Sequence, residues 1–186
     1  GLFGSKRNWW SIARQLADTR HVVVADLRNH GASPWDPVHD YPALADDVAR
    51  LIENRLGGRA AVIGHSMGGK AAMMLALDRP ELVERLVVVD IAPMRSPGNS
   101  ADILRAMQHV PLDRCGNRAD VEAALAADVP DTKVRAFLAA NVVSGPEGLA
   151  WGVNLDAIAR HLDDILSFPD VPAGRTFAGP TLVVAG

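Results

Sequence analysis

The chain has 186 residues and a formal net charge of −3, without a clustered basic stripe, which argues against a nucleic acid or an anionic membrane as partner. This length suits one domain with a sizeable core; no apolar run can span a bilayer and no signal-peptide pattern is present, so we expect a cytoplasmic protein. The single cysteine, Cys115, excludes an internal disulfide and a cysteine-based zinc site.

The first part of the chain predicts a loop, a helix and a strand. Residues 1–5 are rich in glycine, and residues 8–17 carry apolar side chains at helical spacing. The β-branched run at 21–27 is typical of a strand that helices cover on both faces. In the turn-rich loop that follows, we interpret His30 as a residue that orders the loop rather than as a catalytic base.

A second helix and further strands follow. Asp40 is placed to cap a helix that Gly57 and Gly58 end. Residues 83–93 predict another buried strand, with a carboxylate, Asp90, at its C-terminal end. Strands that are almost entirely apolar and alternate with helices indicate an α/β fold with a mostly parallel sheet, in which ligands bind at the carboxyl ends of the strands.

The most informative stretch is residues 60–72, AAVIGHSMGGKAA. An apolar strand, a Gly-x-Ser-x-Gly turn and an Ala/Met-rich helix follow one another there. This context predicts that Ser66 stands on a sharp strand-to-helix turn as a nucleophile, with glycines two before and two after because a Cβ would collide with neighbouring backbone. The Met67 N–H, at the start of the helix, would face a developing oxyanion.

His65 adjoins the serine, but we do not expect it to be the general base. Adjacent side chains on such a turn point in different directions, and a base must reach the serine Oγ within hydrogen-bond distance.

The sequence pattern changes over residues 94–178, where helical patterns are separated by Pro- and Gly-containing turns and no convincing strand is predicted. We therefore expect a core over 1–93, an inserted helical cap over 94–178 and a return strand of the core over 179–186. Because the chain opens without a strand and closes on one, we also expect an internal fragment that lacks the first strands and the last strand and helix of its fold.

Several of these motifs together resemble one known family. They are the glycine-rich opening Gly1–Ser5, Asn8-Trp9, the run from Val22 through Leu27-Arg28-Asn29-His30-Gly31 to Ser33, the stretch from Gly64 to Lys70, and the run from Val88 to Pro93. This set is similar to the α/β-hydrolase fold, and within it to the YbfF-like esterases and their mitochondrial abhydrolase relatives. Lys70 and the Asp-Ile-Ala-Pro run are its more specific marks.

The resemblance implies a serine esterase with a Ser-His-Asp triad that acts on small-molecule carboxylic esters or thioesters. Ser66 would be the nucleophile, and the backbone N–H groups of Leu2 and Met67 would form the oxyanion hole. The acid would be Asp90, as in YbfF-like esterases; in many α/β hydrolases it instead follows the strand that corresponds to 180–186. The histidine would lie beyond this chain, so the fragment alone should be nearly inactive.

In this fold, a strand that would precede Gly1 separates the strand at 22–26 from the nucleophile strand. We therefore expect no direct ladder between 22–25 and 61–63. No metal or organic cofactor is expected. The alternatives are other chemistry on the same fold, such as carbon–carbon bond hydrolysis or a cofactor-free haloperoxidase, and a non-catalytic ligand receptor.

Overall fold

The computed structural model describes residues 1–146 and 148–185. In chain order its elements are η1 (Lys6–Trp9), α1 (Trp10–Ala17), α2 (Tyr41–Arg55), β1 (Ala60–His65), α3 (Met67–Asp78), η2 (Pro80–Leu82), β2 (Val83–Val89), α4 (Ser100–His109), η3 (Leu112–Arg114), α5 (Arg118–Ala124), η4 (Leu125–Ala127), α6 (Thr132–Ala139), β3 (Val142–Gly145), β4 (Gly148–Trp151), α7 (Leu155–Arg160), α8 (Leu162–Leu166) and β5 (Thr181–Val184). They form two compact units. The first consists of Gly1–Leu2, Asp36–Pro97 and His161–Gly186, the second of Phe3–Trp35 and Gly98–Arg160. The division into core and cap at residues 93 and 178 stays a prediction.

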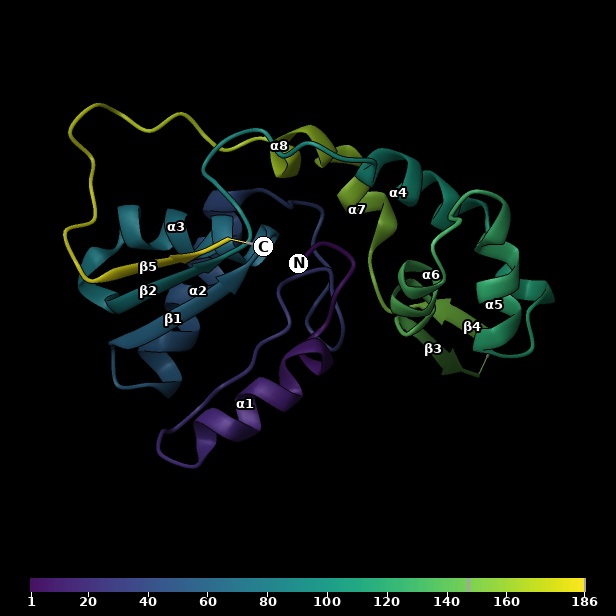
Figure 1. Ribbon diagram of the computed structural model, residues 1–186, viewed down its shortest axis with the longest axis horizontal. Helices are drawn as coiled ribbons and strands as arrows, with labels where there is room; N and C mark the ends of the chain where they lie inside the picture. The colour runs from purple at the N-terminus through teal and green to yellow at the C-terminus, as the bar shows by residue number, and fades with distance from the viewer. Residues whose placement is uncertain (147, 186) are drawn as a thin grey trace. The chain divides into compact units, whose positions relative to one another are not determined.

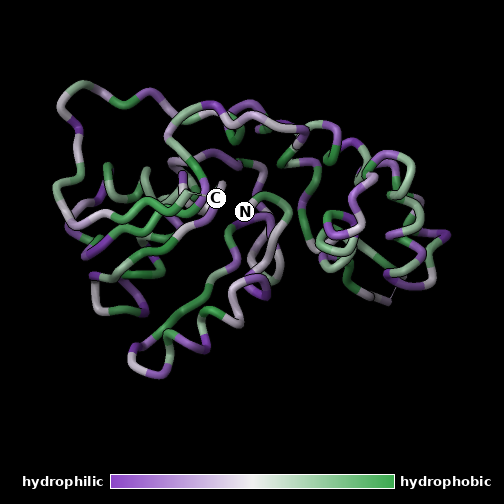
Figure 2. Tube along the Cα trace, in the orientation of Figure 1, coloured by the Kyte–Doolittle hydropathy of each residue, from purple (hydrophilic) through white to green (hydrophobic). Residues whose placement is uncertain are grey.

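The first unit contains a three-stranded parallel sheet in the order β1-β2-β5 (Figure 1). The strands are in register through pairs such as Val62 with Leu86 and Val88 with Val183. Helix α3 packs on β1 and β2, and α2 packs on α3. The strands are mostly apolar (Figure 2), as is typical of a parallel sheet, but β2 carries the exposed Glu84 and Arg85 near its start.

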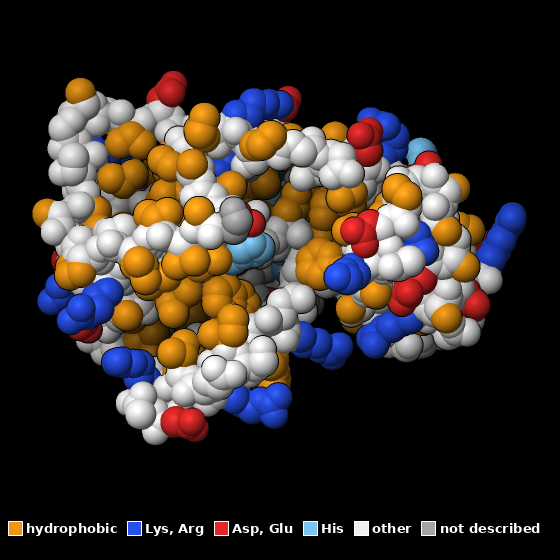
Figure 3. Space-filling model, viewed as in Figure 1, with side chains coloured by type: hydrophobic (Ala, Val, Ile, Leu, Met, Phe, Trp, Pro, Cys, Tyr) orange, Lys and Arg blue, Asp and Glu red, His pale blue; other side chains and the backbone are white. Residues whose placement is uncertain are grey.

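This sheet carries exposed apolar side chains on both faces: Ile63 and Leu182 share one face through their register with Val87, and Val183, the next residue of β5, lies on the other. Ile63, Leu182 and Val183 are 41%, 57% and 63% exposed, and Figure 3 shows hydrophobic side chains gathered where the strands lie. Sheets of this kind are normally covered on both faces. The described residues of this unit therefore cover the sheet only in part.

The predicted ends of the second helix are confirmed. The Asp40 carboxylate accepts a hydrogen bond from the Ala43 N–H at 2.9 Å at the start of α2. After its last turn, Gly57 and Gly58 adopt φ values of 73° and 87°, which favour glycine. These two signals fix a 15-residue helix.

The second unit corrects two expectations. A two-stranded antiparallel hairpin, β3–β4, lies in the region where the sequence indicated only helices. Each strand has four residues, too few for periodicity to reveal. The second correction concerns residues 155–168, where one helix was predicted. Two short helices form there instead, α7 and α8, and α8 belongs to the first unit.

No strand forms over residues 21–27, where the β-branched run predicted one. A strand needs neighbours for its backbone groups, and none is supplied by the described residues. β1 accordingly pairs with β2 alone within the described chain, so the ladder that would contradict the expected topology is not formed. Asp26, at the end of the run, instead accepts hydrogen bonds from the N–H groups of Lys6 and Ala32 at 2.6 and 3.0 Å.

His30 orders its loop, as predicted. Its side chain is buried at 1% exposure, its Nδ1 donates to the Arg28 carbonyl at 3.0 Å, and its backbone forms an isolated bridge with Val153. Burial lowers the pKa of His30 to about 4. The imidazole is therefore neutral at physiological pH.

This burial predicts a specific loss of stability in acid. The unfolded chain takes up the proton near pH 6.5 and the folded chain only near pH 4, so the free energy of unfolding falls between these values by up to about 3 kcal/mol. Urea unfolding at pH 7 and pH 4.5 measures this fall. We expect it to be smaller in His30→Gln and unchanged in His109→Gln, which alters an exposed histidine. An equal fall in all three proteins would contradict the assignment.

Candidate active site

Ser66 lies on the sharp turn that joins β1 to α3. Its φ and ψ are 51° and −122°, a sparsely populated conformation for a residue other than glycine that costs about 1–3 kcal/mol. The turn is held by backbone bonds: the Ser66 N–H donates to the Val89 carbonyl at 3.1 Å, and the Ser66 carbonyl accepts from Gly69 and Lys70. The side chain is partly exposed rather than turned into the core.

Two glycines enclose this turn, but they are not the pair that the motif suggested. A Cβ on Gly64 would lie 2.2 Å from the Gly68 carbonyl oxygen, and a Cβ on Gly69 would lie 2.6 Å from Ile91 Cγ2. A Cβ on Gly68 would meet no described atom within 4 Å. The expectation of a collision two residues after the serine was therefore wrong, because a Cβ at position 68 would lie in open space.

We expect Gly64→Ala to destabilise the protein by at least about 3 kcal/mol, because the clash is with backbone that cannot move aside. Gly68→Ala is the matched control, and we expect it to be neutral or to stabilise α3 by up to about 1 kcal/mol. Chemical denaturation of the two variants measures both effects. Equal stabilities would show that the turn does not depend on close packing at position 64.

Two backbone amides lie at this turn. Met67 is the first residue of α3, where N–H groups have no intrahelical acceptor and the helix dipole favours negative charge. A Cβ on Gly1 would lie 3.6 Å from Ser66 Cβ and 3.3 Å from His65 Nδ1, so the segment Gly1–Leu2 runs directly beside the turn. The two residues predicted to form an oxyanion hole thus belong to segments that meet at Ser66.

Asp90 follows the last residue of β2, at the carboxyl end of the sheet. It has a φ of 53°, and its N–H donates to the Val184 carbonyl at 2.7 Å. Its side chain is 62% exposed and lies 4.0 Å from His65 Nε2. Burial lowers the pKa of His65, and the Asp90 charge opposes that shift only in part.

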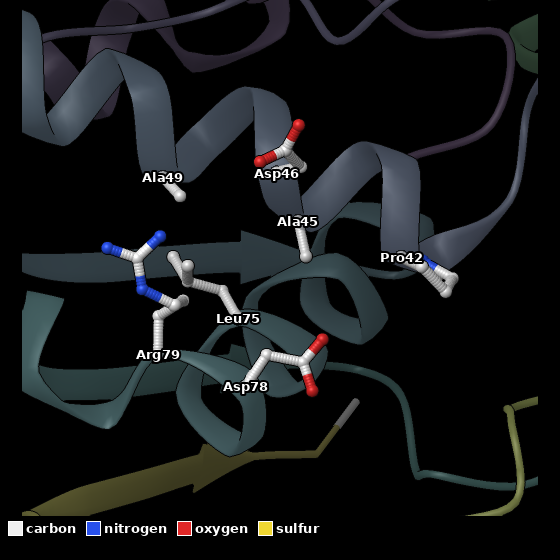
Figure 4. Close-up of a pocket in the computed structure, with 7 residues that line it drawn as sticks. All are labelled: Pro42, Ala45, Asp46, Ala49, Leu75, Asp78 and Arg79. Atoms are coloured by element: carbon white, nitrogen blue, oxygen red, sulfur yellow. The ribbon is translucent and has the colours of Figure 1, made fainter.

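A separate surface hollow lies between α2 and α3 (Figure 4). Its lining residues are Pro42, Ala45, Asp46, Ala49, Leu75, Asp78 and Arg79. Leu75, Asp78 and Arg79 stand at the C-terminal end of α3 and beyond, whereas Ser66 precedes its N-terminus. Arg79 pairs with Glu53 and Glu81, and Asp78 with Arg175. Because Arg79 and Asp78 are already paired with charged residues outside the lining of the hollow, we assign no site there.

Neither a metal cluster nor a membrane-crossing helix is found in the described chain. Within residues 1–146 and 148–185, no group of three or more His, Cys, Asp or Glu side chains could hold a metal ion. The described helices are all too short or too polar to cross a bilayer.

A family model for the alpha/beta hydrolase fold matches residues 1–185. The chain belongs to that family. In the alpha/beta hydrolase fold, the serine of a Gly-x-Ser-x-Gly turn stands above the carboxyl edge of the sheet. This is the position that Ser66 takes between β1 and α3.

Several relatives of this chain are named as lipases or esterases. The sn-1-specific diacylglycerol lipase ABHD11 of Danio rerio is 43% identical over 194 residues, covering all of this chain and 61% of that protein. Esterase YbfF of Escherichia coli is 33% identical over 187 residues, covering all of this chain and 71% of that protein. A solved marine microorganism esterase superposes with a TM-score of 0.94 at 31% identity, covering all of this chain and 74% of that one. The chain spans about three fifths of the length of the ABHD11 proteins it matches.

Proposed function

We propose that the full-length protein is a serine esterase that hydrolyses small-molecule carboxylic esters or thioesters through an acyl-enzyme. The observation that carries this proposal is Ser66 held at positive φ between a strand and a helix N-terminus. The names of the relatives, diacylglycerol lipase and esterase, support an ester as substrate.

In the proposed reaction, Ser66 Oγ attacks the acyl carbonyl carbon and gives its proton to a histidine. The N–H groups of Leu2 and Met67 bind the oxyanion, each contributing roughly 3–4 kcal/mol to the transition state. Asp90 orients the imidazole and stabilises its positive charge. The alcohol leaves with the proton, and water then hydrolyses the acyl-enzyme with the same groups.

We expect this histidine to lie outside residues 1–186, as the family resemblance implies. His65 lies 4.0 Å from Asp90, but it adjoins Ser66 on the turn, where neighbouring side chains point in different directions. We therefore expect the 186-residue chain by itself to show at most the residual catalysis of the oxyanion hole, about 10³–10⁴-fold over water.

Pre-steady-state kinetics of the full-length protein test the proposal against other chemistry on the same fold. With a short-chain p-nitrophenyl ester we expect a burst of about one nitrophenol per active site, followed by slower turnover. We expect no turnover of a β-diketone. Cleavage of the diketone without ester hydrolysis would indicate a carbon–carbon bond hydrolase, and tight binding without turnover of either would indicate a receptor.

A further inference from the structure

Lys70 is a buried cation that the proposed mechanism does not use. It lies on α3, one turn after Ser66, with 0% of its surface exposed. Its Nζ donates to the Ser96 Oγ, the Leu166 carbonyl and the Ser167 carbonyl at 2.8, 2.9 and 2.8 Å. An ammonium group has three donors, so all of them are satisfied.

The acceptors of Lys70 belong to two segments far apart in sequence. Leu166 and Ser167 form the C-terminal end of α8, where a cation is favoured. Tyr41 completes the enclosure: its ring centroid lies 5.8 Å from Nζ, and its hydroxyl donates to the Ile165 carbonyl at 2.6 Å. The end of α8 is thus held by side chains from α2 and α3.

The other segment is the one that continues from Asp90. Its first residue, Ile91, packs so closely on Gly69 that a Cβ there would lie 2.6 Å away. Its far end, Ser96, bonds to Lys70 through its side chain and to the Leu166 carbonyl through its N–H, at 2.7 Å. Two consecutive residues of α3, Gly69 and Lys70, therefore hold both ends of residues 91–96.

Resting on the proposed function, we propose that Lys70 is a positioning residue for Asp90. By anchoring Ser96 to α3 while Ile91 packs on Gly69, it fixes the segment that leaves the end of β2, and with it the direction in which the Asp90 carboxylate points. Lys70 and the run that begins at Asp90 are the two more specific motifs of the family resemblance. On this proposal they act together to orient the catalytic acid.

The cost of burying this ammonium favours such a role. Burial, assisted by the charge of Arg95, lowers the pKa of Lys70 to about 8. An apolar side chain of similar length would fill the same space without this cost. What only the ammonium supplies is the three directed hydrogen bonds that fix Ser96 against the end of α8.

A double-mutant cycle on the full-length protein tests the proposal. We expect Lys70→Met to lower kcat for a short-chain ester by ~10–100-fold with KM little changed, as removal of a supporting group does. We expect Asp90→Asn to lower kcat by about 10⁴-fold. The double variant should lie within about 2-fold of Asp90→Asn, because a displaced acid and an absent acid are equivalent.

Three other outcomes would overturn the proposal: losses that multiply in the double variant, a change in KM alone, or wild-type kinetics in Lys70→Met. The first is the result for a lysine that only stabilises the fold. Lys133→Met, which alters an exposed lysine on α6, is the matched control and should match wild type. If Lys70→Met does not fold, Ser96→Ala removes one of the three bonds and must show the same non-additivity with Asp90→Asn.

Fluorophosphonate labelling of the wild type separates this proposal from the proposed function. If the wild type is not labelled, the proposed function fails. If it is labelled but the losses multiply in the double variant, only the role of Lys70 is overturned.

Discussion

Replacing Ser66 by alanine is expected to lower kcat for ester hydrolysis by the full-length protein by about 10⁶-fold. The alanine keeps the fold, because position 66 is already partly exposed and its backbone bonds to Val89, Gly69 and Lys70 do not involve the hydroxyl. What disappears is the oxygen that would form the acyl-enzyme. The remaining rate should be that of the oxyanion hole and binding, about 10³–10⁴-fold over water.

Steady-state hydrolysis of a p-nitrophenyl ester, followed with enzyme concentrations high enough to see the residual rate, measures this loss. Ser11→Ala is the matched control, since Ser11 is an exposed serine on α1. The thermal midpoints of both variants should stay close to that of the wild type. A Ser66→Ala protein that hydrolyses the ester at more than a few per cent of the wild-type rate would remove Ser66 from the chemistry.

The second large effect is expected at Asp90. Asparagine has the same shape, so the bond from the residue 90 N–H to the Val184 carbonyl is kept, but a neutral amide cannot stabilise an imidazolium. We expect kcat to fall by about 10⁴-fold with little change in KM. The Asp90 side chain is 62% exposed, so its carboxylate is accessible to the histidine that the proposed mechanism requires.

Kinetics of Asp90→Asn and of Asp170→Asn, an exposed carboxylate that serves as the control, test the assignment. Wild-type activity in Asp90→Asn would place the acid after β5 instead, as in many α/β hydrolases. In that case Ser66 keeps its proposed role, and the two assignments are tested independently.

The part of the fold that local chemistry specifies could be predicted from the sequence. The turn at Ser66 follows from an apolar strand, small residues and a helix in succession, and the ends of α2 follow from one carboxylate and two glycines. These features involve neighbours in sequence, so no knowledge of the tertiary structure is needed.

Features of the fold and the site that depend on residues far apart in the sequence could not be predicted. The run at 21–27 has the composition of a strand, yet no described strand pairs with it. Gly68 and Gly69 are indistinguishable in the motif, and only the position of Ile91 shows which one must lack a Cβ. The partners of Lys70 lie 26 to 97 residues away, although a lysine among the small and apolar residues of α3 is itself a signal that buried oxygen acceptors exist.

Site mapping of a fluorophosphonate adduct on the full-length protein tests most directly whether the Ser66 hydroxyl is the nucleophile. Trypsin should release residues 60–70, cut after Arg59 and Lys70, and this peptide contains one serine and no threonine or tyrosine. We predict that the phosphonate is found on this peptide, at Ser66, with one adduct per chain. An adduct on another residue, or an unlabelled protein that still hydrolyses esters, would contradict the claim.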